Sequence, residues 1–146
     1  MKYVAFVVIA LLVGCAAPRR SSEMDDVAEA VLRYMCPPEA RSTSFFAYGP
    51  DIDPTQEFLR RFVDFERPPK PMSASVIRDV FVYDKTTGER GSRFVIESVK
   101  ITGTDEAEVD ASSETGGGFG GSGYTYSIAR KDGKWTVTGK RARWVA

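Results

Sequence analysis

The sequence predicts an α+β fold in which one or two N-terminal helices pack on a curled antiparallel sheet of about four strands. Apolar residues recur at helical spacing in two segments, residues 22–35 and 53–63. From Ser75 onward, segments rich in Val, Ile, Phe and Tyr alternate with glycine-containing turns, which is typical of strands in meander order. The N-terminal half therefore supplies the helices and the C-terminal half supplies the sheet.

The chain begins with a short apolar segment that ends at a cysteine. Lys2 precedes an apolar run from Tyr3 to Val13, which is shorter than the roughly 20 residues of a membrane-spanning helix and fits the core of a signal peptide. Its ending, Leu12-Val13-Gly14-Cys15, resembles the lipobox of bacterial lipoproteins. The resemblance implies that residues 1–14 are a signal peptide removed before Cys15, which then carries the acyl chains.

This interpretation predicts that the protein is located in the bacterial cell envelope. Residues 15–22 become a tether and residues 23–146 a single α+β domain, held at the membrane because each buried acyl CH₂ contributes about 0.8 kcal/mol. Ala16 stands where enterobacterial lipoproteins retained at the inner membrane have Asp, so we expect the outer membrane, facing the periplasm. Two alternatives stay open: cleavage after Ala17 by an ordinary signal peptidase, or an uncleaved anchor.

Two helices are expected before the sheet. Ser22 opens a Ser-x-x-Asp capping box for the first, and Pro37-Pro38 ends it. Asp53 is expected to cap the second, with Pro54 at its first position. The side chains expected to face the core are Val27, Val31, Tyr34 and Met35 in the first helix, and Phe58, Leu59, Phe62 and Val63 in the second.

Composition also indicates the structure of three further segments between residues 40 and 75. Residues Ser44–Tyr48 form a short apolar stretch that fits a strand or a packed loop. Arg60 and Arg61 are expected to face solvent. The segment Arg67–Pro71 has too many prolines for a helix or a central strand, so it is expected to be a rigid connector.

The strands are predicted from alternating apolar and polar residues. In Glu106–Ser113 the acidic residues alternate with small apolar ones, so one face should be solvated and the other buried. Asp132-Gly133 lies between two such segments and predicts a tight hairpin. The predicted strands are Ser75–Asp84, Ser92–Thr102, Glu106–Ser113, Tyr124–Ala129 and Trp135–Val145.

The C-terminal half carries a family resemblance. The ordered run Gly123-Tyr-x-Tyr126, Arg130-Lys-Asp-Gly-Lys-Trp135, Val137 and Trp144 resembles the ending of NTF2-like and cystatin-like α+β domains of bacterial envelope proteins. The resemblance covers roughly residues 53–145 and implies a fold but little function, because such folds host enzymes, binders and assembly factors alike. The histidine often present in NTF2-like enzyme pockets is missing here.

Composition excludes several classes of function. Lys+Arg and Asp+Glu both number 20, so there is no basic excess and no nucleic acid partner is expected. The chain has no histidine, the commonest metal ligand and general base near neutral pH, and we expect no cofactor. With Cys15 acylated, Cys36 is the one remaining thiol, and we expect it to be a small buried residue at a helix end.

The expected contact residues are aromatic. The glycine-rich segment Gly116–Gly123 joins two strands and lacks the Gly-Lys-Ser/Thr ending of a nucleotide loop, so it is expected to be a flexible hairpin tip. Phe119 within it would be an exposed aromatic available to a partner. The concave end of a curled sheet can stay open as an apolar pocket, where Tyr124, Tyr126 and Trp135 are expected.

The acidic side chains of the same region are expected to form a solvated face. Alternate residues of one strand share a face, but a metal site needs ligands that converge from several segments. The sequence therefore predicts no metal site. The residues concerned are Glu106, Glu108, Asp110 and Glu114.

Two hypotheses of function follow. The first is a lipid-anchored accessory or binding protein of the envelope, whose partner is another envelope protein, peptidoglycan or a small apolar molecule. The second is a small NTF2-like enzyme that uses carboxylate and tyrosine acid–base chemistry without a metal. An enzyme of that kind needs a carboxyl group with a raised pKa inside its pocket, whereas a binding protein does not. A protein that neutralises a toxin is a third class.

Overall fold

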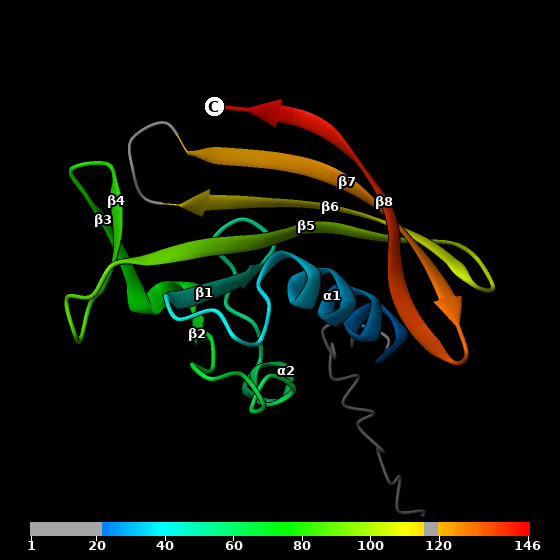
Figure 1. Ribbon diagram of the computed structural model, residues 1–146, viewed down its shortest axis with the longest axis horizontal. Helices are drawn as coiled ribbons and strands as arrows, with labels where there is room; N and C mark the ends of the chain where they lie inside the picture. Colours follow the sequence, from blue (N-terminus) through cyan, green and yellow to red (C-terminus); the bar gives the residue numbers. More distant parts are fainter. Residues whose placement is uncertain (1–21, 116–119) are drawn as a thin grey trace, which may run out of the picture.

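The computed structural model describes residues 22–115 and 120–146 and shows a six-stranded sheet that curls around one long helix (Figure 1). The helical elements are α1 (Ser22–Met35), α2 (Gln56–Arg60) and the 3-10 turn η1 (Met72–Ala74). The strands are β1 (Thr43–Tyr48), β2 (Lys70–Pro71), β3 (Ser75–Arg78), β4 (Phe81–Asp84), β5 (Gly91–Gly103), β6 (Glu106–Thr115), β7 (Gly121–Lys131) and β8 (Lys134–Val145). Among the described residues, no helix has the length and apolar character needed to cross a membrane.

The predicted fold class is wrong. Strands make up 52% and helices 18% of the structure, and the large sheet is mixed, in the order β2-β1-β5-β6-β7-β8. Strand β1 runs parallel to both of its neighbours, while β5 to β8 are antiparallel. Strands β3 and β4 form a separate two-stranded sheet. The predicted antiparallel sheet of about four strands, with its NTF2-like or cystatin-like arrangement, is therefore replaced by a larger mixed sheet.

The strand that changes the fold class is β1. All six of its residues are buried. Phe46 and Tyr48 join the main core beneath α1, whereas Phe45 and Ala47 join a second core on the opposite face of the sheet with Met72 and other residues. A strand buried on both faces shows a continuous apolar run without alternation, which is why Ser44–Tyr48 fitted either a strand or a packed loop.

The predicted single strand Ser75–Asp84 is also wrong, because it is a hairpin. Strands β3 and β4 pair antiparallel, and Asp79 and Val80 form the turn with φ of 47° and 70°. A two-residue hairpin of this kind needs positive φ at both turn positions. Asp adopts this region at moderate cost, but a β-branched residue such as Val rarely does. The turn carries no glycine, so no turn signal in the sequence indicates it.

Helix α1 largely follows the prediction. It ends at Met35, just before Pro37-Pro38, and Val27 and Val31 are fully buried. Tyr34 was expected in the core but is 53% exposed. Cys36 is buried, as predicted, with its Sγ 3.1 Å from the Ser44 Oγ, and burial raises the pKa of the thiol.

Helix α2 is shorter than predicted and has a different cap. The Thr55 hydroxyl, not Asp53, accepts the first free backbone N–H, from Phe58 at 3.1 Å. The Asp53 carboxylate instead accepts the backbone N–H of Ser73 at 2.9 Å. Because the helix ends at Arg60, the helical spacing does not continue to Val63, which is exposed.

Arg61 does not simply face solvent as predicted. Its guanidinium lies 2.6 Å from the Asp26 carboxylate and 3.0 Å from the Glu29 carboxylate on α1. Arg33 of the same helix reaches Asp64 at 2.8 Å. These partly exposed ion pairs orient the segment after α2 against α1 and contribute about 0–1 kcal/mol each.

The order and alternation of the last strands were predicted correctly. β5, β6, β7 and β8 follow one another in space as in sequence. The β7–β8 hairpin turns at Asp132-Gly133, where φ is 51° and 75°. Ala107, Val109 and Ala111 are buried on the α1 side of β6, as the alternation indicated.

Hydrogen bonds to one buried carboxylate group connect the second core to the edge of the large sheet. The Asp84 side chain of β4 is almost fully buried and accepts hydrogen bonds from the Lys70 Nζ of β2 at 2.5 Å and from the backbone N–H groups of Thr86 and Thr87 at 2.8 and 3.1 Å. The hydrogen bond from Lys70 is the main cause that lowers the pKa of Asp84, against the opposing effect of burial. Asp84 thus links the edge of the large sheet to the small one.

Substitutions at two adjacent residues can test which side chains form the main core. Phe62 is fully buried and meets Phe46, Phe58 and Phe65 edge to face, whereas Val63 is 71% exposed. Phe62→Ala should lower the free energy of unfolding by about 3–5 kcal/mol. Val63→Ala, the matched control, should change it by less than about 0.5 kcal/mol. Urea unfolding followed by circular dichroism measures both, and equal effects would contradict the described core.

Acid unfolding tests the role of Asp84. A carboxyl group whose pKa is lowered by folding adds stability above its unfolded pKa of about 4, and this stability is lost as the pH falls through the folded value. Asp84→Asn should therefore be less stable than the wild-type protein at pH 7, and the difference should shrink between about pH 4 and 2. Asp132→Asn, at an exposed turn, is the control that should unfold as the wild type does. A pH-independent difference for Asp84→Asn would contradict the assignment.

Candidate functional site

Three of the four residues that the sequence predicted as contact residues are described, and all three lie on the α1 side of the sheet. Cys15 and Phe119 lie outside the described residues. Tyr124 and Tyr126 are neighbours on the α1 side of β7, with ring centroids 6.0 Å apart. Trp135 is partly buried on the same side, but it forms its own contact beneath the Arg130 guanidinium, 4.5 Å from the ring centroid.

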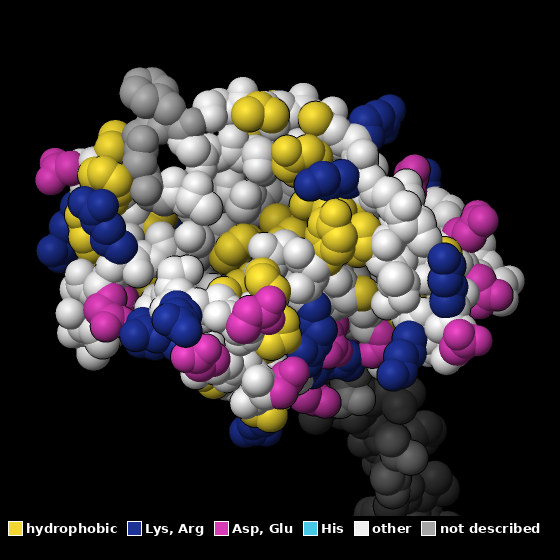
Figure 2. All heavy atoms as spheres, viewed as in Figure 1, with side chains coloured by type: hydrophobic (Ala, Val, Ile, Leu, Met, Phe, Trp, Pro, Cys, Tyr) yellow, Lys and Arg dark blue, Asp and Glu magenta, His cyan; other side chains and the backbone are white. Residues whose placement is uncertain are grey.

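Tyr126 forms part of the main core, and Tyr124 packs against that core. Tyr126 is buried against Tyr34 of α1, and burial raises its pKa to about 12, so its phenol is neutral at physiological pH. Tyr124 is partly exposed, with the Lys140 Nζ 4.7 Å above its ring. Figure 2 shows hydrophobic side chains at the centre of this face, which is the one that carries α1.

The acidic residues lie on the opposite side of the sheet, here called the outer face. Val109 pairs with Tyr126 and points toward α1, so its neighbour Asp110 points away. The same alternation places Glu106, Glu108 and Glu114 on the outer face. The sheet itself therefore stands between these carboxylates and the tyrosines of β7.

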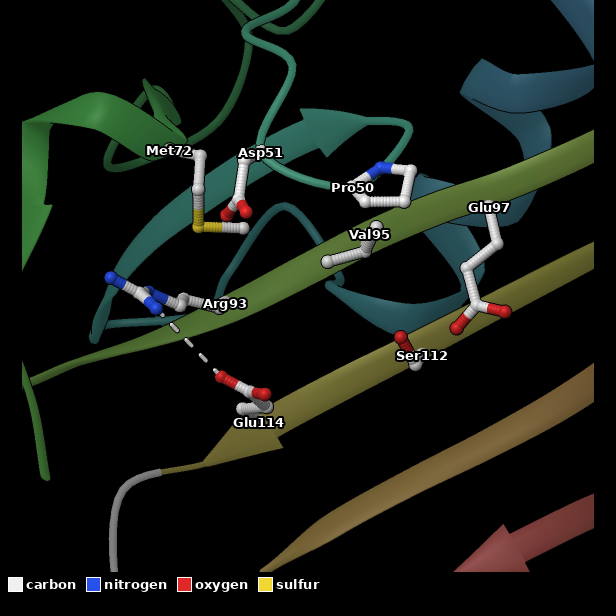
Figure 3. Close-up of a pocket in the computed structure, with 8 residues that line it drawn as sticks. All are labelled: Pro50, Asp51, Met72, Arg93, Val95, Glu97, Ser112 and Glu114. Carbon is white, nitrogen blue, oxygen red and sulfur yellow. Dashed lines mark ion pairs between the residues drawn. The ribbon is translucent and has the colours of Figure 1, made fainter. Parts of the chain in front are cut away.

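A pocket lies on the outer face, between the sheet and the segment around η1. Its volume is about 230 Å³, below the roughly 300–1,000 Å³ of sites that enclose a drug-sized ligand. Figure 3 shows the turn after β1 and Met72 on one side, β5 in the middle and β6 on the other side. The residues that line the pocket are Pro50, Asp51, Met72, Arg93, Val95, Glu97, Ser112 and Glu114.

The turn that forms one wall of the pocket is held against β5. The backbone N–H of Gly49 donates to the Ile96 carbonyl at 2.7 Å, and the N–H of Tyr48 donates to the Ile52 carbonyl at 2.9 Å. Gly49 and Asp51 both have positive φ, 103° and 54°. This conformation reverses the chain at the end of β1, and in Figure 3 the Asp51 carboxylate points toward β5.

Two irregularities in the sheet aim charged side chains at one place beside the pocket. Glu97 is the extra residue where the β5–β6 register shifts between Ile96 and Ser98. Arg143 is the extra residue where the β7–β8 register shifts, because Gly123 pairs with Trp144 but Tyr124 pairs with Ala142. Bulges of this kind redirect side chains and are over-represented next to active sites. The two extra residues, Glu97 and Arg143, form an ion pair with each other.

This ion pair crosses the outer face of the sheet. Glu97 is on β5 and Arg143 on β8, three strand spacings away, roughly 14 Å between strand axes. Both side chains must therefore extend along the sheet surface. The Arg143 guanidinium also lies 3.4 Å from the Asp110 carboxylate, which accepts the Thr125 hydroxyl at 2.6 Å and the Ser98 hydroxyl at 3.3 Å.

Stability alone does not account for this arrangement. The Arg143 and Glu97 side chains are each 28% exposed, and such pairs contribute about 0–1 kcal/mol. Each bulge, in turn, disrupts the hydrogen-bond ladder of its strand pair. The charges that the bulges bring together therefore add little stability of their own.

Trp144 lies beside Arg143 and covers two glycines of β7. A Cβ built on Gly123 would stand 2.2 Å from the indole Nε1, and one on Gly121 would stand 3.0 Å from the ring carbon Cζ3. The ring therefore rests on the bare backbone of β7, as aromatic residues do over glycines in designed sheets. The Trp144 side chain stays 41% exposed. We name Glu97, Asp110, Arg143 and Trp144 the bulge site.

Sequence reasoning missed the bulge site. Trp144 was noted only as part of a family resemblance, Asp110 only as one of several surface acids, and Glu97 and Arg143 not at all. One signal was available: Gly121 and Gly123 alternate on one face of a strand, which leaves room for a large side chain from a neighbouring strand. The bulges themselves depend on pairing and leave no mark in the sequence.

In the described part of the chain, hydrogen bonds and neighbouring cations lower the pKa of three aspartates. The pKa of Asp110 is lowered first by its hydrogen bond from Thr125 and further by Arg143. The pKa values of Asp64 and Asp84 are also lowered, by Arg33 and Lys70. Carboxylates of this kind stay ionised and serve as hydrogen-bond acceptors. No cluster of Cys, Asp or Glu among residues 22–115 and 120–146 has the geometry to hold a metal ion.

Comparison with protein-family models, with curated proteins and with solved structures finds no match to this chain. The site is therefore described from its own geometry.

The contact between Trp144 and Gly123 can be tested by a single methyl group. Gly123→Ala places a Cβ where the indole lies and should displace the ring into solvent. In a Trp135→Phe background, where Trp144 is the single tryptophan, the emission maximum should shift to longer wavelength. Gly139→Ala is the matched control on the next strand, because a Cβ there meets no atom within 4 Å. An unchanged Gly123→Ala spectrum would contradict the stacked geometry.

Proposed function

We propose that this protein is a lipid-anchored accessory protein of the bacterial envelope, in the outer membrane facing the periplasm, that binds a ligand through the outer face of its sheet. The proposed location in the envelope is supported by the lipobox-like ending Leu12-Val13-Gly14-Cys15. The first described helix begins at Ser22, seven positions after Cys15 in the sequence.

The observation that carries the binding function is the convergence of two bulge residues beside an exposed tryptophan. Glu97 and Arg143 come from strands that are not neighbours, yet they meet on the outer face next to Trp144 and the pocket. An aromatic ring with hydrogen-bonding groups fixed around it is the usual composition of a ligand site.

The alternative of a carboxylate and tyrosine acid–base enzyme gains no support from the described residues. Such chemistry needs both groups within hydrogen-bond reach of one substrate. Here Tyr126 is buried on the α1 side, while Asp110 and Glu114 lie on the outer face. We therefore do not carry the enzyme hypothesis further.

The anchor is tested by mass and by membrane partitioning of the protein expressed in its bacterial envelope. The wild-type protein should lose residues 1–14, gain the mass of the acyl chains and fractionate with membranes. Cys15→Ser should stay unacylated and lose membrane association. Cys36→Ala, which removes the other cysteine, should leave both properties unchanged. An exported, soluble, unmodified wild-type product would contradict the anchor.

A further inference from the structure

We infer that the bulge site and the adjoining pocket bind a saccharide, with one pyranose ring stacked on Trp144 and the next hydrogen-bonded in the pocket that Asp51 lines. The inference rests on the proposed binding function of the outer face and names its ligand class. It depends on the ring, the polar groups on the same face, the charge balance and the row of residues between the ring and the pocket.

The ring supplies an apolar platform with one face free. Gly121 and Gly123 support the indole from below, so Trp144 lies along the sheet and does not stand out from it. A ring held in this way loses little conformational freedom when a ligand binds. Its face carries partial negative charge and attracts the weakly positive C–H groups of a pyranose ring, whose equatorial hydroxyls point outward to the sides.

The polar groups lie on the same outer face as the ring. Arg143, the chain neighbour of Trp144, extends along the sheet from β8 to Glu97 on β5 and also meets Asp110, so this face carries a planar donor and two carboxylate acceptors. Their positions are already fixed by one another and by the Thr125 hydroxyl. Sugar hydroxyls both donate and accept, and ionised partners give stronger hydrogen bonds than neutral ones.

The charge balance opposes an anionic ligand. The bulge site and pocket together contain the cations Arg93 and Arg143 against the carboxylates Asp51, Glu97, Asp110 and Glu114. A phosphate or a nucleic acid would therefore be repelled. A free ammonium ligand is less suited than a sugar, because a cation-binding cage uses several aromatic rings and the described residues of this site include one.

The shape suits a chain lying across the sheet. Val95, Ser112, Gly123 and Trp144 form one row across β5, β6, β7 and β8, since each is the register partner of the next. Gly123 lies under the Trp144 ring, and the small side chain of Ser112 separates the ring from the rest of the pocket. The pocket, at about 230 Å³, is too small for a large ligand but adjoins this row.

The experiment is a titration of the protein as isolated from the cells that express it, kept in solution where needed by a detergent without a sugar headgroup. The Trp135→Phe background makes Trp144 the single reporter. The probes are chitotetraose and cellotetraose, which are neutral β-linked chains, and spermidine as the cationic competitor. At least one of the two oligosaccharides should change Trp144 emission with saturation below about 10 mM.

Calorimetric titration of variants then assigns the contacts. Trp144→Ala and Arg143→Ala should each weaken oligosaccharide binding tenfold or more, and Trp144→Phe should retain part of the affinity. Circular dichroism and the thermal midpoint check that the variants fold. Trp135→Phe, on the α1 side of the sheet, should leave the affinity unchanged.

Three results would overturn the inference: no response to either oligosaccharide up to about 10 mM, binding that Trp144→Ala leaves intact, or a response to spermidine alone. Failure here is distinguishable from failure of the anchor, because acylation of Cys15 is read by mass in a separate experiment. If the protein is acylated but binds neither oligosaccharide, the proposed envelope location stands and the proposed saccharide ligand is wrong.

Discussion

The burial of β1 on both of its faces is the constraint on which the rest of the structure depends. Phe45 and Phe46 are adjacent and point in opposite directions, so each must be covered by a different layer. Helix α1, α2 and the segment after α2 cover Phe46. The η1 turn and the β3–β4 hairpin cover Phe45. The outer face of the sheet is thus covered over β1 and, among the described residues, more exposed over β7 and β8.

This division positions the candidate site. Where the cover over Phe45 ends, the turn Gly49–Ile52 and Met72 form one wall of the pocket, and the open sheet forms its floor. Pairing of β1 with β5 ends at Ile96, and the bulge at Glu97 follows directly. The end of one strand pair and the bulge in the next thus coincide, which directs Glu97 across the open face toward Arg143.

The α1 side of the sheet has a different character. Tyr34, Tyr124 and Tyr126 meet there with Lys140 above them, and Trp135 lies under Arg130. These contacts close the core around α1 as the sheet curls (Figure 1). The outer face instead exposes one aromatic ring among ion pairs whose contribution to stability is small. The two faces therefore separate structural aromatic residues from the binding residues proposed above.

The sequence by itself determined what depends on neighbouring residues. Apolar spacing and Pro37-Pro38 determined α1, alternation determined the faces of β6 and β7, and Asp132-Gly133 determined the final hairpin. Tertiary structure decided what depends on distant pairing. Parallel partners such as β1 and β5 are separated by a long crossover, and no local pattern encodes which strand a buried apolar run joins. The hairpin at Asp79-Val80 adopts positive φ without glycine, which only its strand pairing reveals. The bulge residues Glu97 and Arg143 belong to the same class, because a bulge exists only relative to a partner strand.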